Sequence, residues 1–209
     1  MKFINCRIDV LKKVFRPRPE TEFWVGKALS NIKNKKSNIK NSAILDIFSG
    51  SGCIGIAVLK SSESACVDFV DISKDAISQI KINLNLNKIP ENRYKIYQSN
   101  LFEKLKGKKY DFIFANPPYV ALDRIGEVQK EVLKKDPHVA LFAGKDGMLI
   151  IEKFLSQVKK YLKPDGKIFM EFDPQQTGKI KEILKKESLN VQFKKDQFGK
   201  IRWLEAGIY

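Results

Sequence analysis

Histidine, cysteine and long apolar runs are scarce in this chain of 209 residues. The only histidine, His138, excludes Ser-His-Asp catalysis elsewhere in the chain and leaves no histidine-based metal cluster, so we expect no metal site. The three cysteines form no Cys-x-x-Cys pair and are odd in number, which predicts reduced thiols and a cytoplasmic location. Apolar runs are only strand-length and no secretory signal precedes them, so we expect no membrane partner.

Negative charge is also in short supply. Lys and Arg number 39 against 24 Asp and Glu, which gives a net charge of +15. Such an excess favours an anionic partner, for example nucleic acid or a ribosome-associated protein. Most of these charges are lysines scattered over Asn- and Ile-rich segments, so solvated faces explain the excess about equally well.

Strand-like and helical patterns alternate along the chain, which predicts an α/β fold with a mostly parallel sheet. Two consecutive strands at the end predict an antiparallel pair at the C-terminal edge of the sheet. We expect one domain over 1–209, with residues 1–15 as a hairpin extension. The expected strands are 43–48, 65–70, 94–98, 110–115, 167–172, 190–195 and 201–207. The expected helices are one that starts over 19–29 and ends within the polar segment 30–42, then 53–60, one capped by Ser73, 146–162 and 177–186, with a turn over 163–166.

Two expected strand ends carry the marks of a nucleoside site, and ligands of open α/β sheets bind at such ends. Gly50, Gly52 and Gly55 spell GxGxxG between a strand and a helix, where backbone N–H groups can hold a ligand. A tight turn without a ligand would look the same. Asp71 ends the next strand, where a carboxylate can accept hydrogen bonds from both hydroxyls of a ribose.

Asp46 distinguishes between cofactors. It stands four residues before Gly50, where it would repel a pyrophosphate but could pair with a cationic amino-acid group. S-adenosylmethionine has a ribose, an α-ammonium and a sulfonium without phosphate, so Asp46 favours methyl transfer over hydride transfer. The alternative is an acid that only binds local backbone N–H groups.

The apolar stretch 110–115 ends in Asn116-Pro117-Pro118-Tyr119. An NH₂ group presents two donors, and methylating its nitrogen requires that acceptors hold both hydrogens. The side-chain oxygen of Asn116 and the carbonyl of Pro117 supply two acceptors, which the prolines hold in direction. Tyr119 can stack on a planar substrate group. We therefore predict that residues 116–119 methylate an amino or amide nitrogen; a simple Pro-Pro turn is the alternative.

With these motifs, the chain resembles the HemK-like protein-glutamine methyltransferases of peptide chain release factors over nearly its whole length. The resembling segments are RPETE (18–22), AILDIFSGSGCIGIAV (43–58), Asp71, SNLF (99–102), NPPY (116–119), DPHVALFAGKDG (136–147) and Asp196, Gly199 and Arg202. NPPY alone is shared with methyltransferases of adenine in DNA or of RNA, whereas RPETE and 136–147 are more specific.

The resemblance implies a Rossmann-like S-adenosylmethionine-dependent methyltransferase fold and methylation of the glutamine amide in the Gly-Gly-Gln motif of a release factor. It implies catalytic roles for residues 116–119 and substrate-binding roles for Asn116, Pro117, Tyr119 and Arg18. The implied cofactor-binding residues are Thr21, Asp46, Ile47, Phe48, Ser49, Gly50, Gly52, Asp71, Ile72, Asn100, Leu101 and Asn116. We expect a monomer, with adenine-N6 DNA or RNA methylation as the second choice.

Several departures from the family pattern leave alternatives open. Phe48 and Asp173 stand where the family usually has glycine, and Asn100 stands where it usually has aspartate. Phe48 could widen the first turn, and Asn100 can accept a hydrogen bond from adenine but without charge. These changes favour a non-catalytic module that binds RNA or a protein as another alternative. We also expect the helical amino-terminal domain of bacterial relatives to be absent here.

Overall fold

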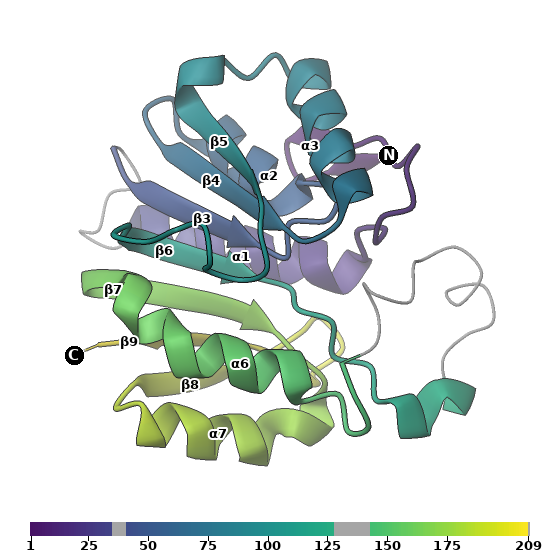
Figure 1. Cartoon of the computed structure of the whole chain (residues 1–209), viewed down its shortest axis with the longest axis vertical. Helices are drawn as coiled ribbons and strands as arrows, with labels where there is room; N and C mark the ends of the chain where they lie inside the picture. The colour runs from purple at the N-terminus through teal and green to yellow at the C-terminus, as the bar shows by residue number, and fades with distance from the viewer. Residues whose placement is uncertain (35–40, 128–142, 209) are drawn as a thin grey trace.

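The computed structural model describes residues 1–34, 41–127 and 143–208. Its centre is a seven-stranded sheet with strand order β5-β4-β3-β6-β7-β9-β8 (Figure 1). The bounds are β3 Ala43–Ile47, β4 Cys66–Asp71, β5 Tyr94–Gln98, β6 Tyr110–Ala115, β7 Leu162–Glu171, β8 Asn190–Lys195 and β9 Ile201–Gly207. The first five strands in chain order are parallel, and β9 pairs antiparallel with both β7 and β8. The predicted mostly parallel sheet with an antiparallel C-terminal pair is confirmed.

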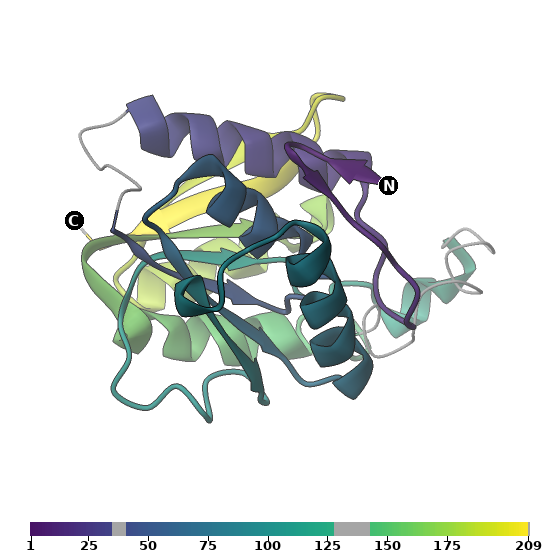
Figure 2. The same cartoon turned by 90° about the horizontal axis from the view of Figure 1, so that it is seen from above.

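Helices cover both faces of this sheet (Figure 2). One face packs against α1 Pro19–Asn34, α2 Cys53–Ser61 and α3 Lys74–Leu86, and the other against α6 Leu149–Val158 and α7 Thr177–Lys186. Alternation along the strands creates both cores, because Phe112 and Phe114 face the first layer while Ile113 and Ala115 face the second. The short 3₁₀ turns are Glu91–Arg93, Leu122–Glu127, Lys159–Tyr161 and Pro174–Gln176. None of the helices described is long and apolar enough to cross a membrane.

The N-terminal segment forms the predicted hairpin in a reduced form. Only β1 Lys2–Phe3 and β2 Cys6–Arg7 pair, and residues 8–15 continue as a strap without strand pairing. Buried amides on α3 and at its C-cap residue hold this strap and the end of β2. Asn83 accepts from the Asp9 N–H at 2.8 Å and donates to the Asp9 carbonyl at 2.9 Å. Asn87 makes the same two-way contact with Arg7, and Gln79 accepts from the Lys12 N–H.

Some predicted boundaries were wrong, most by one residue and those between 146 and 167 by more. The first helix ends at Asn34, within the segment 30–42 where its end was expected, and buried Ile32 extends its apolar face to that point. The helix expected from 146 begins at Leu149, since Gly147 has a left-handed backbone (φ 75°) that an α-helix cannot include. The turn expected over 163–166 falls inside β7, where the register with β6 shifts between Tyr110 and Phe112.

Candidate functional site

A cavity of about 310 Å³ opens at the carboxyl ends of β3, β4 and β6. This size is typical of small-molecule sites. Most of the residues predicted to bind cofactor or substrate line it together. They are Arg18, Thr21, Ile47, Phe48, Ser49, Gly50, Asp71, Ile72, Asn100, Leu101, Asn116, Pro117, Pro118 and Tyr119. Asp46 and Gly52 are not among the residues that line it, although Gly52 is the N-cap of α2 directly behind the turn.

Asp71 ties two turns together at the end of β4. Its Oδ2 accepts from the Gly50 N–H at 2.8 Å, and its Oδ1 accepts from the Ser73 N–H at 2.9 Å. Burial raises the pKa of Asp71, and these hydrogen bonds offset part of the rise. Each oxygen keeps a second lone-pair direction for a ligand hydroxyl. The site is therefore suited to the ribose of the expected cofactor.

Phe48 has a backbone conformation that glycine adopts more readily than other residues. Its φ is 62°, in the left-handed region that side chains rarely occupy, and its ring packs edge-on against Phe154 at 5.7 Å. Leu101, which also lines the cavity, has a φ of 47°. Strained backbone therefore lies at the site, as is common for functional loops, and a widening of the turn by Phe48 stays a prediction.

Asp46 lies behind the turn. It is 1% exposed, and its Oδ2 accepts from the Gly55 N–H at 2.8 Å. Desolvation raises its pKa from 3.8 to about 7 despite that hydrogen bond. This geometry matches the alternative considered above, an acid that binds local backbone N–H groups. A direct contact between Asp46 and a cationic cofactor group stays a prediction.

The Asn116–Tyr119 corner faces the same cavity and is tied to distant elements. The Asn116 Nδ2 donates to the Thr21 hydroxyl at 3.4 Å, and the Tyr119 hydroxyl donates to Glu171 at 3.0 Å. Thr21 also donates to Glu171, at 2.7 Å. Burial and the charge of Glu171 hold the pKa of Tyr119 well above its usual range, so this phenol stays protonated. Our sequence reasoning missed Glu171, although it too follows an apolar run at a strand end.

The backbone of the corner is fixed from a second direction. Gln176, which is buried, donates to the Tyr119 carbonyl at 3.1 Å and to the Gly147 carbonyl at 3.0 Å. A Cβ built on Gly147 would lie 2.3 Å from the Tyr119 oxygen, so only glycine fits there. Gly147 ends the segment 136–147; its first part, with His138, lies outside the described residues.

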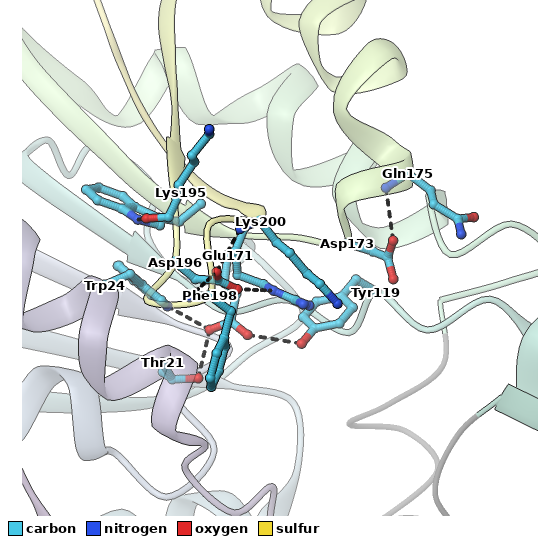
Figure 3. Close-up of polar contacts among 12 residues, drawn as sticks. Thr21, Trp24, Tyr119, Glu171, Asp173, Gln175, Lys195, Asp196, Phe198 and Lys200 are labelled. Carbon is cyan, nitrogen blue, oxygen red and sulfur yellow. Dashed lines mark hydrogen bonds and ion pairs between the residues drawn. The ribbon is translucent and has the colours of Figure 1, made fainter.

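Two other departures have local explanations. Asp173 has a φ of −76° and needs no glycine; it caps the turn after β7 by accepting from the Gln175 N–H at 3.0 Å (Figure 3). The Asn100 Nδ2 donates a hydrogen bond to the Glu103 carboxylate at 2.9 Å, so the side-chain oxygen of Asn100 is left to accept from a ligand.

Comparison with known proteins agrees with this geometry. A family model described as "Methyltransferase small domain" matches residues 28–141. A release factor glutamine methyltransferase from Lactococcus lactis subsp. lactis is 33% identical, over 98% of this chain and 73% of its own length. This chain belongs to the family of the release factor glutamine methyltransferases. It is therefore a methyltransferase, and the cofactor expected from its sequence, S-adenosylmethionine, agrees with the family.

Further relatives define how far the likeness extends. A bifunctional methyltransferase from Rickettsia bellii is 36% identical over 75% of this chain, which spans only 28% of that longer protein. Among solved structures, a ribosomal protein L11 methylase from Lactobacillus delbrueckii subsp. bulgaricus matches with a TM-score of 0.67 and 19% identity, over 93% of this chain and 81% of its own. At that identity the match supports the methyltransferase fold alone.

Proposed function

We propose that this methyltransferase methylates the side-chain amide of the Gly-Gly-Gln glutamine in a peptide chain release factor. S-adenosylmethionine supplies the methyl group when it is bound. The observation that carries the proposal is that the Asn116–Tyr119 corner and Asp71 line one cavity. This shared cavity supports an assignment in which Asp71 accepts from a ribose hydroxyl while the corner accepts from the NH₂ group of a planar amide.

Each residue has a distinct task in this proposal. Asp71 and the turn around Gly50 hold the nucleoside. The Asn116 oxygen and the Pro117 carbonyl accept the two amide hydrogens, which orients the glutamine nitrogen, and Tyr119 covers the plane of the amide. Orientation supplies most of the rate in such an arrangement, because a fixed geometry replaces a bimolecular encounter. Arg18, at the mouth of the cavity, is the proposed contact with the substrate protein.

Labelled-methyl transfer tests the proposal. Purified protein with labelled S-adenosylmethionine is offered a release factor, the same factor with its Gly-Gly-Gln glutamine changed to alanine, duplex DNA and RNA. We expect label only in the intact release factor, and its loss in the Asn116→Ala variant. Incorporation into nucleic acid but not into the release factor would refute the proposal.

The net charge of +15 favours one other candidate, methylation of an exocyclic amine in DNA or RNA. The same acceptor pair would serve adenine N6 as well as an amide. The nucleic-acid arms of the experiment decide between the two. The charge also fits steering of an acidic release factor, in which case the association rate must fall as salt is added.

A further inference from the structure

The carboxylate of Glu171 joins three elements beneath the substrate corner (Figure 3). It is 1% exposed and ends β7. Its Oε2 accepts from the Thr21 hydroxyl at 2.7 Å and from the Trp24 indole N–H at 2.6 Å, and its Oε1 accepts from the Tyr119 hydroxyl at 3.0 Å. Thr21 and Trp24 lie on α1, and Tyr119 follows β6, so one carboxylate links the helix that borders the cavity to the corner.

The direction of each hydrogen bond follows from what a carboxylate can do. Burial raises the pKa of Glu171, but three donors and the nearby Arg202 cation favour its ionised form, which only accepts. Thr21 has a single hydroxyl proton and donates it to Glu171. Toward Asn116 the Thr21 oxygen can then only accept, and the Asn116 Nδ2 is the atom that donates to it.

These two hydrogen bonds, from Thr21 to Glu171 and from Asn116 to Thr21, determine which end of the Asn116 side-chain amide faces the substrate. With Nδ2 held by Thr21, the Oδ1 is the end left for the cavity. A flipped Asn116 would direct an NH₂ group at the NH₂ group of the substrate, donor against donor. The bond at 3.4 Å is long, so by itself it orders the amide weakly; the acceptor-only partner behind Thr21 makes the flipped state unfavourable.

We propose that Glu171 is a positioning residue that, through Thr21, makes Asn116 present its oxygen to the substrate and, through Tyr119, fixes the ring that covers it. As a statement about catalysis it rests on the proposed function; as a statement about the orientation of the Asn116 amide it does not. Glu171 itself touches neither the substrate nor the reacting atoms in this assignment.

The discriminating variants are Glu171→Gln, Thr21→Val and Thr21→Ser. A glutamine has one oxygen for three donors, so its NH₂ group must face Thr21 and Trp24 or Tyr119. Thr21→Val keeps the shape but removes the hydroxyl, whereas Thr21→Ser restores it. Glu205→Gln is the matched control, because Glu205 is 5% exposed on β9 and pairs with Lys167 away from the cavity.

Two readouts keep the inference separate from the proposed function. The first is the ¹⁵N–¹H signal of the Asn116 side-chain amide, assigned with Asn116→Asp. We expect it to shift in Glu171→Gln and Thr21→Val and to return toward the wild-type position in Thr21→Ser. An amide signal unmoved in both of the first two variants would overturn the inference, whatever the substrate.

The second readout is methyl transfer to the release factor with the affinity for S-adenosylmethionine measured in parallel. Glu171→Gln and Thr21→Val should lower kcat on the order of 10- to 100-fold, as loss of a positioning contact does. Because Thr21 is itself an expected cofactor contact, only Glu171→Gln is expected to do so without a matching loss of cofactor affinity. Thr21→Ser should recover most of that loss, and Glu205→Gln should retain wild-type kcat. An inactive wild type refutes the proposed function alone, and the amide signal still decides the inference. An active wild type with unchanged kcat in both variants overturns the inference alone.

Discussion

Gly147 is the position where a single methyl group should have the largest effect on the substrate corner. Its φ of 75° is left-handed, and a Cβ there would lie 2.3 Å from the Tyr119 oxygen and 2.8 Å from the Gln176 Nε2. The first contact is with backbone, which cannot rotate away as a side chain can. Gly147→Ala must therefore displace residue 119 or the segment that carries residue 147.

The cost can be worked from three contributions. Alanine in the left-handed region costs about 1 kcal/mol. The overlap with the Tyr119 carbonyl costs about 1–3 kcal/mol as overpacking. Weakening of the two Gln176 hydrogen bonds adds up to about 1 kcal/mol each. We expect Gly147→Ala to lower the free energy of unfolding by roughly 2–6 kcal/mol, a large part of a typical total of about 5–15 kcal/mol.

Urea unfolding measures this loss, and Gly199→Ala isolates the backbone contribution. Gly199 has a φ of 79° and open space around its Cβ position, so alanine there should cost only about 1 kcal/mol. In the folded fraction of Gly147→Ala, displacement of residue 119 by about 1 Å should lower kcat on the order of 100-fold. If Gly147→Ala unfolds at the same urea concentration as Gly199→Ala, with the same kcat as wild type, the geometry described for this corner is wrong.

Two further predictions concern the cofactor side. Because the pKa of Asp46 is about 7 when folded and 3.8 when unfolded, the folded state binds the proton more tightly, so stability should fall as pH rises from about 4 to about 7. The loss is at most roughly 4 kcal/mol; urea unfolding across that range should show a flatter profile for Asp46→Asn than for wild type, and parallel profiles would contradict the reasoning. Asn83→Ala removes the side chain that pairs with both backbone groups of Asp9, so the free energy of unfolding should fall by roughly 2–3 kcal/mol. Because the strap continues into the cavity wall, the variant should also bind S-adenosylmethionine more weakly, as measured by calorimetry. Asn85→Ala, on the exposed face of the same helix, is the control; equal losses in the two variants would show that the strap does not depend on Asn83.

The strand pattern was predictable because each strand is a short apolar run bounded by turn residues. Strands 94–98, 110–115, 190–195 and 201–207 have the predicted bounds, and the strand order placed Asp71 and Asn116 at one edge. The start of α6 was not predictable from periodicity, because Gly147 has a left-handed backbone and packs closely against the Tyr119 carbonyl. These two residues are far apart in the sequence, and no local pattern indicates that they are in contact.

The residues that sequence reasoning missed all act over long separations. Gln176 reaches the Tyr119 carbonyl across 57 residues, and Asn83 reaches Asp9 across 74. In the sequence each is an ordinary polar side chain near or within a helix. Glu171 differs, because it follows the apolar run of β7 as Asp71 follows that of β4. Applying the strand-end rule to every parallel strand would have found it.

The expectation that polar residues at strand ends form the site does not distinguish residues that contact a ligand from residues that hold the site in place. Asp46, Asp71 and Glu171 are all carboxylates at or near strand ends. Asp71 lines the cavity, whereas Asp46 and Glu171 are 1% exposed. Both oxygens of Glu171 accept from protein donors, but only the Oδ2 of Asp46 does, and its buried Oδ1 has no hydrogen-bond partner among the described residues. Burying a carboxylate is costly unless donors surround it, so a fully buried acid at such an edge indicates that the groups donating to it must be held in place. Around Glu171 those groups are Thr21, Trp24 and Tyr119, two of which line the cavity, and this is why its removal should affect turnover more than cofactor binding.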